Sequence, residues 1–179
     1  GVLYTLSPTL SVTVSGTISK VYDASRDAEV TLSNYSPVAG ALNGDLVNLT
    51  APSSALFNNS NVGENKSITL SGVTVGSNSR TLGGASIYGY SVLVTNALVG
   101  TITAAPLGIQ VTGTYSGSNT LTNISSFTVT GLQGSDTITS LDSVTVSDKN
   151  VATTNKYVTG LVIGSGSANM INYSLNNSY

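Results

Sequence analysis

The sequence predicts an all-β, mainly β chain of two tandem small, sandwich-like β modules joined end to end. Apolar residues alternate with hydroxyl residues in short runs, Gly and Asn separate the runs, and one series of motifs occurs twice, about 90 residues apart. Alternation with a period of two is typical of half-buried strands, and glycine permits the positive φ angles of tight turns. A repeat of about 90 residues has the length of a small domain and is too long for a solenoid coil.

The strands follow from the alternation, taken in chain order. The first apolar run is Leu10, Val12 and Val14, with Ser and Thr between them. Residues 24–30 form the one helical candidate, although Asp, Ser and Arg suit a loop equally well there. Further strands are predicted at Ile68/Leu70, Val73/Val75, Tyr90/Val92/Val94, Ile109/Val111, Phe127/Val129, Val144/Val146, Leu161/Ile163 and Ile171/Tyr173/Leu175.

The duplication sets the module boundaries. The matched segments are 16–23 with 111–117, 41–45 with 131–136, 60–63 with 149–152, 65–66 with 155–156, and 90–93 with 173–175. Residues 101–111 and 5–12 both run from a strand into proline and then into a new strand, so we place the boundary near Ala105. The predicted modules are therefore residues 1–105 and 106–179. The second copy ends before a counterpart of residues 99–103, so we expect this module to lack its last strand and to expose an edge.

Composition excludes several functional classes. Charged residues make up 8% and the net charge is −2, so the chain lacks the basic footprint of a nucleic-acid partner. Cysteine and histidine are absent, which excludes disulfides and the usual zinc ligands, and the eight acidic residues form no calcium-type cluster. We expect no cofactor and no metal. No apolar run reaches the roughly 20 residues of a membrane span, so we expect no membrane insertion.

Several motifs together resemble a known family. They are Lys20-Val21-Tyr22-Asp23, the Leu-x-Gly-Asp element at 42–45, Asn61-Val62-Gly63, Tyr90-Ser91-Val92 and the segment 99–107. In this order they resemble the YDG and MBG repeat modules of large bacterial surface adhesins, including filamentous haemagglutinin-like exoproteins of two-partner secretion systems. The signature Tyr-Asp-Gly appears here as Tyr22-Asp23-Ala24 and as Tyr115-Ser116-Gly117.

The resemblance implies an extracellular, mainly β protein of the bacterial surface whose modules are sandwich-like or β-grasp-like. Neither copy carries a plausible catalytic centre, so we expect that the chain is not an enzyme. The expected role is a structural spacer that projects a binding region and so contributes to cell adhesion or biofilm. Host-cell or matrix glycans and receptors would be partners of the parent adhesin, and the fragment itself is expected to be monomeric. The alternative is that the chain is itself a carbohydrate- or receptor-binding module.

Two groups of residues are candidates for ligand or active-site chemistry. Asp45 and Asp136 have the residue type of a glycosidase carboxylate pair, but they occupy equivalent places in separate modules, which favours turn capping. Tyr22, Tyr90, Tyr115 and Tyr173 recur at strand positions, which favours core packing with a bonded hydroxyl over sugar stacking. The tyrosines without counterparts are better candidates for a contact surface, and they are Tyr35, Tyr88, Tyr157 and Tyr179.

A covalent crosslink is a further possibility. A spontaneous Lys-to-Asn isopeptide bond needs a lysine, an asparagine and an assisting acid together in an apolar core. Lys20 and Asn96 are the candidates for the bond, with Asp23 or Glu64 as the acid. The position that matches Lys20 in the second copy is Gly113, so such a bond would not recur in both modules.

Overall fold

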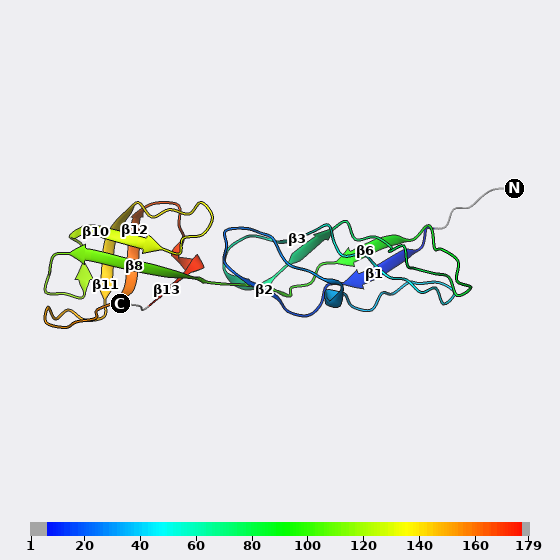
Figure 1. Cartoon of the computed structure of the whole chain (residues 1–179), viewed down its shortest axis with the longest axis horizontal. Helices are drawn as coiled ribbons and strands as arrows, with labels where there is room; N and C mark the ends of the chain where they lie inside the picture. Colours follow the sequence, from blue (N-terminus) through cyan, green and yellow to red (C-terminus); the bar gives the residue numbers. More distant parts are fainter. Residues whose placement is uncertain (1–6, 177–179) are drawn as a thin grey trace. The chain divides into compact units, whose positions relative to one another are not determined.

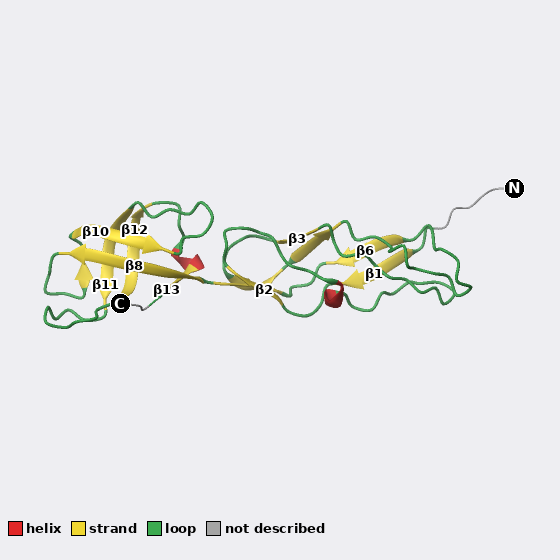
Figure 2. Ribbon diagram, in the orientation of Figure 1, coloured by secondary structure: helices red, strands yellow, loops and turns green. Residues whose placement is uncertain are grey.

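The structure is a computed structural model that describes residues 7–176. Strands dominate it, and the prediction of an all-β fold is confirmed (Figure 2). The strands are β1 (Thr9–Thr13), β2 (Ile18–Val21), β3 (Ser54–Phe57), β4 (Gly63–Lys66), β5 (Ile68–Ser71), β6 (Ser91–Thr95), β7 (Gly100–Thr103), β8 (Ala105–Gly113), β9 (Thr120–Leu121), β10 (Ile124–Thr130), β11 (Ser140–Val146), β12 (Val158–Ser165) and β13 (Tyr173–Leu175).

Helical structure is limited to two short 3₁₀ turns, η1 (Leu32–Asn34) and η2 (Met170–Asn172). The helical candidate at residues 24–30 is wrong. Asp23 accepts the amide proton of Ser25 at 2.9 Å, which starts a turn, and Asp27 forms an isolated β-bridge with Leu56. No helix within residues 7–176 has the length and apolar character needed to cross a bilayer.

The described residues form two compact units. Unit 1 comprises residues 7–20, 26–59 and 63–101, and unit 2 comprises residues 21–25, 60–62 and 102–176. The main division falls between Thr101 and Ile102, close to the boundary predicted near Ala105. The module limits 1–105 and 106–179 stay a prediction. Two short segments of the first sequence copy, 21–25 and 60–62, have most of their contacts in unit 2.

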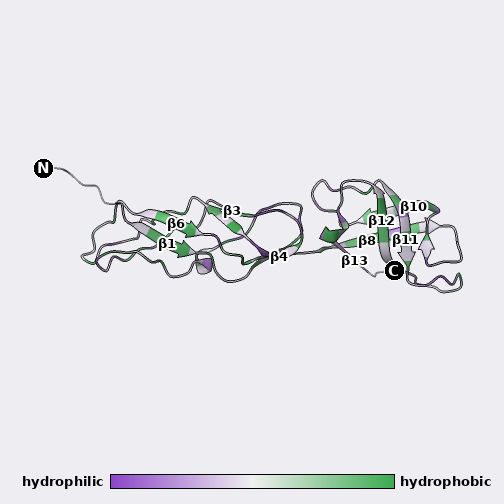
Figure 3. Cartoon of the chain, turned by 180° about the vertical axis from the view of Figure 1, so that it is seen from behind, coloured by the Kyte–Doolittle hydropathy of each residue, from purple (hydrophilic) through white to green (hydrophobic). Residues whose placement is uncertain are grey.

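Unit 1 has its core around the parallel pair β1–β6 (Figure 1). Leu10 and Val12 point inward from β1, and the serine and threonine between them face solvent. Leu49 joins them, and half-buried apolar side chains pack around this cluster. Figure 3 shows apolar segments on strands such as β1 and β6.

Unit 2 repeats the same strand pairings. The pair β13–β8 is parallel, like β1–β6, and places Leu175 opposite Leu107. The pair β11–β12 is antiparallel, like β3–β5, and its last register partners are Val146 and Val158. Leu107 and Val144 are fully buried and form the centre of the unit. The duplicated sequence therefore specifies a duplicated arrangement of strands.

The register defines which residues correspond between the units. Tyr90 precedes β6 as Tyr173 begins β13, so Leu10 corresponds to Leu107. Phe57 lies opposite Ile68, as Val146 lies opposite Val158. Asn65 and Asn155, each followed by lysine, both have positive φ, at 52° and 57°, so this turn is repeated in detail.

Candidate functional site

Unit 1 contains a cluster built from a tyrosine, an aspartate and a backbone amide. The Tyr90 hydroxyl donates to Asp45 Oδ2 at 2.7 Å and accepts the amide proton of Leu42 at 2.9 Å. The Asp45 amide donates to the Leu42 carbonyl at 2.9 Å, which closes the turn that carries both groups. The tyrosine thus fixes the turn to the start of β6. We call this arrangement the tyrosine–aspartate cluster.

Unit 2 contains the same cluster at the matching positions. The Tyr173 hydroxyl donates to Asp136 Oδ2 at 2.6 Å and accepts the amide proton of Gln133 at 3.0 Å. The Asp136 amide donates to the Gln133 carbonyl at 3.0 Å. The three-residue spacing between amide and aspartate is the same in both units, so the cluster belongs to the repeat.

A second tyrosine enlarges the cluster of unit 2. The Tyr22 hydroxyl donates to Asp136 Oδ2 at 2.9 Å, and its ring meets that of Tyr173 edge to face, with centroids 5.4 Å apart and an interplanar angle of 80°. Both rings are buried. Edge-to-face contact is a favoured aromatic geometry, and hydrogen bonds to a carboxylate are stronger than those between neutral groups. Asp136 therefore binds two buried hydroxyls at one oxygen.

These contacts give the two aspartates a structural role. Asp45 and Asp136 belong to different units and accept tyrosine hydroxyls within turns, as turn anchoring requires. Tyr22, Tyr90 and Tyr173 each have the bonded hydroxyl that core packing predicted. The same prediction is wrong for Tyr115, which is 58% exposed, because its turn extends beyond the end of β8.

The cluster of unit 2 makes stability sensitive to alkaline pH. Burial and the hydrogen bond to the Asp136 carboxylate raise the pKa of Tyr173 from 10.0 to about 12. Burial and the same carboxylate also raise the pKa of Tyr22. The folded state therefore holds these protons more tightly than the unfolded state does.

We expect the contribution of these two tyrosines to the free energy of unfolding of unit 2 to be fully present below pH 10 and to be lost as the pH rises from 10 toward 12. Urea unfolding followed by circular dichroism at successive pH values measures this. The Tyr173→Phe variant should show a shallower fall, because one of the coupled protons is gone. The matched control is Tyr88→Phe, whose ring is 87% exposed and should leave the profile unchanged. A slope unchanged by Tyr173→Phe would contradict the assignment.

The residue after Tyr22-Asp23 is under backbone strain. Ala24 has a φ of 65°, in the left-handed region that glycine adopts without a steric penalty and alanine adopts only with one. This is the position at which the Tyr-Asp-Gly signature has its glycine. A glycine at this position of the signature would adopt the positive φ without strain. Alanine at position 24 of this chain adopts it at a cost in free energy.

We expect Ala24→Gly to stabilise unit 2 by about 1 kcal/mol. Hydrogen exchange of unit 2 amides measures the change. The matched control is Ala152→Gly, at an exposed alanine of the same unit outside the positive-φ set, which should destabilise by about 0.5 kcal/mol through chain entropy alone. A loss of stability with Ala24→Gly equal to that of the control would contradict the strain.

A buried asparagine supports the same unit. Asn172 is 2% exposed, and its Oδ1 accepts the Val62 amide proton at 2.9 Å while its Nδ2 donates to Asn61 Oδ1 at 3.1 Å. The repeat in the sequence includes Asn61-Val62, but the sequence does not indicate which residue these two contact. The structure shows that both ends of the Asn172 amide are satisfied, as burial requires.

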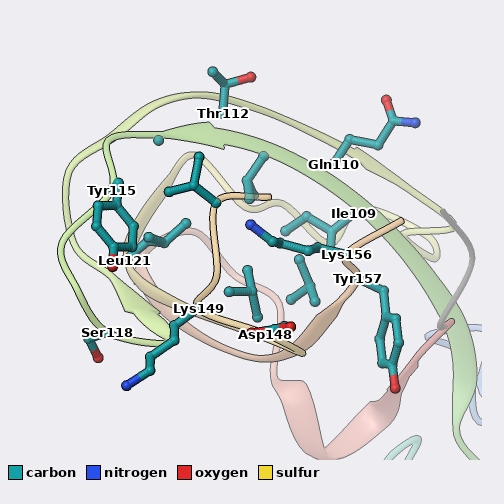
Figure 4. Close-up of a pocket in the computed structure, with 15 residues that line it drawn as sticks. Ile109, Gln110, Thr112, Tyr115, Ser118, Leu121, Asp148, Lys149, Lys156 and Tyr157 are labelled. Atoms are coloured by element: carbon teal, nitrogen blue, oxygen red, sulfur yellow. The ribbon is translucent and has the colours of Figure 1, made fainter. Parts of the chain in front are cut away.

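Unit 2 also has an open pocket of about 470 Å³ (Figure 4). Its floor is apolar, with side chains from the end of β8, the end of β11 and the start of β12. Polar and aromatic groups lie at its margin, and Figure 4 shows Lys156 extending toward the middle while Lys149 points outward. The residues that line it are Ile109, Gln110, Val111, Thr112, Gly113, Tyr115, Ser118, Leu121, Val146, Asp148, Lys149, Val151, Lys156, Tyr157 and Val158.

The one acid of this pocket is a turn residue. Asp148 accepts the Thr153 hydroxyl at 2.6 Å and the Asn150 amide proton at 2.9 Å. These hydrogen bonds lower the pKa of the Asp148 carboxyl. A carboxylate held ionised by its own turn is suited to ordering residues 148–153 and poorly suited to donating a proton.

The tyrosines predicted to contact ligand lie in different surroundings. Tyr35 packs against the core of unit 1, and its hydroxyl donates to the Thr50 carbonyl at 3.0 Å. Burial raises the pKa of Tyr35. Tyr88 is 87% exposed, and Tyr157 lines the pocket of unit 2. Tyr179 lies outside the described residues, and ligand contact by any of these side chains stays a prediction.

The residues of the predicted crosslink are placed as follows. The Lys20 ammonium lies 5.6 Å from the centroid of the Phe57 ring, Asn96 and Glu64 are exposed, and Asp23 belongs to unit 2. The Lys20–Asn96 bond stays a prediction, and intact mass tests it because each bond formed removes one ammonia.

The structure brings together a different lysine and asparagine in unit 1. Lys66 is 6% exposed, donates to Asn59 Oδ1 at 2.7 Å and has its pKa lowered by burial. Its position in the repeated Asn-Lys pair is visible in the sequence, but its burial depends on β7, a strand distant along the chain.

Neither the tyrosine–aspartate clusters nor the pocket contains a group of side chains suited to a metal ion. Within residues 7–176, no three His, Cys, Asp or Glu side chains are grouped closely enough to hold one.

Comparisons with known proteins identify one family. The family model described as the YDG domain matches residues 7–98. Comparison with curated proteins and with solved structures finds no match.

Proposed function

Because the chain belongs to the YDG domain family, we propose that it is a structural spacer segment of a secreted bacterial surface adhesin. In this role its units hold a binding region away from the cell and so contribute to adhesion or biofilm. The parent adhesin, exported by two-partner secretion, would meet host-cell or matrix glycans and receptors at another part of its length.

The repeated tyrosine–aspartate cluster carries this proposal. Both units use an aspartate and a tyrosine at matching positions to fix a turn to a strand. A stalk needs each of its units to be stable on its own, and small modules with thin cores gain stability from such satisfied buried hydrogen bonds. This chain has no cysteine, and these clusters stabilise its small units as disulfides stabilise many small extracellular domains.

Single-molecule stretching combined with binding assays tests the spacer role. The intact chain should give two separate unfolding events per molecule and should bind neither a glycan array nor immobilised matrix proteins. Asp136→Ala should weaken one of the two events and leave the other, because Asp136 belongs to unit 2 alone. Saturable binding of the isolated chain to glycans or matrix would contradict the spacer role.

The pocket of unit 2 supports a second candidate function, that of a carbohydrate-binding module. Tyr115 and Tyr157 offer aromatic faces beside charged groups, a combination common in ligand sites. The measurement is binding to a glycan array. If this function is present, Tyr157→Ala should abolish the signal, while Val162→Ala, at an exposed position of the same unit that does not line the pocket, should leave it intact.

A further inference from the structure

The pocket of unit 2 corresponds to a region that is covered in unit 1. Counting along the matched strands, Val14 corresponds to Val111 and Phe57 to Val146. Val14 and Phe57 are 1% and 0% exposed in unit 1, whereas Val111 and Val146 are only half-buried and line the pocket. The same apolar positions are thus closed in one unit and open in the other.

The lysine of the repeated Asn-Lys turn shows the same difference. Lys66 is 6% exposed in unit 1, and its counterpart Lys156 is half-buried and reaches into the pocket of unit 2 (Figure 4). Burial of an ammonium group costs free energy and requires a cover with hydrogen-bond acceptors. Unit 1 provides this cover, and the described part of unit 2 leaves the equivalent lysine at an open surface.

The start of strand β7 covers Phe57 in unit 1, to which its first two residues, Gly100 and Thr101, belong. It lies between β2 and β4 in a three-stranded sheet. A Cβ atom added at Gly100 would lie 2.7 Å from a carbon of the Phe57 ring and 2.9 Å from the Lys66 carbonyl oxygen, so the backbone of β7 rests directly on these two residues. Glycine is required there because any side chain would collide with the ring or the carbonyl.

The neighbours of β7 have no counterpart strands in the described part of unit 2. The counterpart of β4 is residues 153–156, which form no strand. The start of β2 corresponds to Tyr115, which lies beyond the end of β8 and lines the pocket. In the described residues of unit 2, no strand follows β13 to take the place that β7 has in unit 1. No strand within residues 7–176 therefore covers this edge of unit 2.

We propose that the pocket of unit 2 is an acceptor site for one extended strand of the β7 type, with the pattern Gly-Thr-Ile-Thr. The glycine would lie over Val146 and the carbonyl of Lys156, as Gly100 lies over Phe57 and Lys66. The branched apolar residue two positions later faces the same side of the strand and closes the apolar floor. The occupant is an uncharged β-strand, which matches a mainly apolar floor. This inference concerns strand binding by unit 2 and holds whether or not the chain is a spacer.

The test extends the full chain so that the repeat continues in register. Leu175 corresponds to Val92 in the parallel pairs, so Tyr179 corresponds to Asn96, and a copy of residues 97–105 is appended directly after Tyr179. We expect amide exchange at residues 109–113 and 144–158 to slow by about tenfold or more relative to the unextended chain. Lysine acetylation should also slow at Lys156 and remain unchanged at Lys149, which points away from the pocket.

The matched control carries the same extension with its glycine replaced by leucine and its isoleucine by aspartate. This control has the same length and tether but cannot pack on Val146 or fill the apolar floor. It should leave exchange at both segments as in the unextended chain. Equal protection by the two extensions, or no protection by either, would overturn the proposal. Saturable glycan binding or the loss of two-event unfolding would bear on the proposed function alone, so the two failures are distinguishable.

Discussion

Replacement of Asp136 by alanine is expected to destabilise unit 2 by about 3 kcal/mol. The carboxylate accepts hydroxyl protons from Tyr22 and Tyr173, both of which are buried, and the variant leaves two donors without an acceptor. A hydrogen bond to a charged group contributes about 1.5 to 3 kcal/mol, and the two bonds share one oxygen, so their contributions are less than additive. Hydrogen exchange of unit 2 amides in the full chain gives the free energy.

The matched control for this prediction is Asp45→Ala in unit 1. Asp45 accepts the hydroxyl of Tyr90, whose side chain is half-buried, so the expected loss is about 1 kcal/mol, measured on unit 1 amides. In a Tyr22→Phe background, the loss caused by Asp136→Ala should be closer to the loss caused by Asp45→Ala, because Asp136 then accepts only one tyrosine hydroxyl. Equal losses at Asp45 and Asp136 would show that the second tyrosine adds nothing.

Local patterns in the sequence predict part of the strands and the repeat. Alternation located β1, β5 and β6 within one residue and fell inside β8, β10, β11 and β12, which begin three or four residues earlier than predicted. The strand predicted at Val73/Val75 is wrong, because Val75 forms only an isolated β-bridge with Leu49. The matching of Tyr90 with Tyr173 and of Asp45 with Asp136 correctly paired residues that the structure places in equivalent clusters. What the sequence did not show is that the tyrosine and the aspartate bind each other, since 45 residues separate them in unit 1 and 37 in unit 2.

The errors have a common physical origin. The helical candidate at residues 24–30 failed because a single side chain, Asp23, redirects the backbone into a turn and Ala24 adopts a positive φ. Tyr115 was expected in the core because the sequence match pairs it with Tyr22, whereas the strand register that pairs Val14 with Val111 pairs Tyr115 with Ile18. Tyr22 is buried by partners from residues 136 and 173, and Tyr115 is exposed. The match in sequence is therefore offset from the match in structure, and burial depends on what the rest of the chain brings to a residue.

The position of the pocket illustrates the same limit. The expectation of a missing last strand in the second module came from counting motifs, and it points to the edge at which the pocket lies. The apolar floor, the half-exposed Lys156 and the glycine packing of the equivalent strand come only from the register of distant segments. The missing last strand stays a prediction, and the proposal of a strand site rests on these tertiary contacts.

Replacement of Gly131 by alanine is expected to destabilise unit 2 by about 4 kcal/mol. Gly131 has a φ of 90°, and an added Cβ would collide with the carbonyl oxygen of Pro106 on strand β8. Pro106 is held in the β8–β13 pair, and Gly131 directly follows β10, which pairs with β8, so neither backbone can move aside without disturbing the ladders beside it. Thermal unfolding and amide exchange of unit 2 measure the loss.

Two variants separate the collision from the cost of the backbone angle. Gly117→Ala, at a φ of 77° and with no atom within 4 Å of the added Cβ, should lose only about 1 kcal/mol, the cost of a left-handed alanine. Gly40→Ala should reproduce the large loss in unit 1, because its added Cβ would collide with the Thr9 carbonyl oxygen at the corresponding place beside Leu10. Similar small losses at Gly117 and Gly131 would mean that β8 yields to the added methyl group. A large loss at both Gly40 and Gly131 would instead show that the repeat preserves a close approach of two backbones, which only glycine allows.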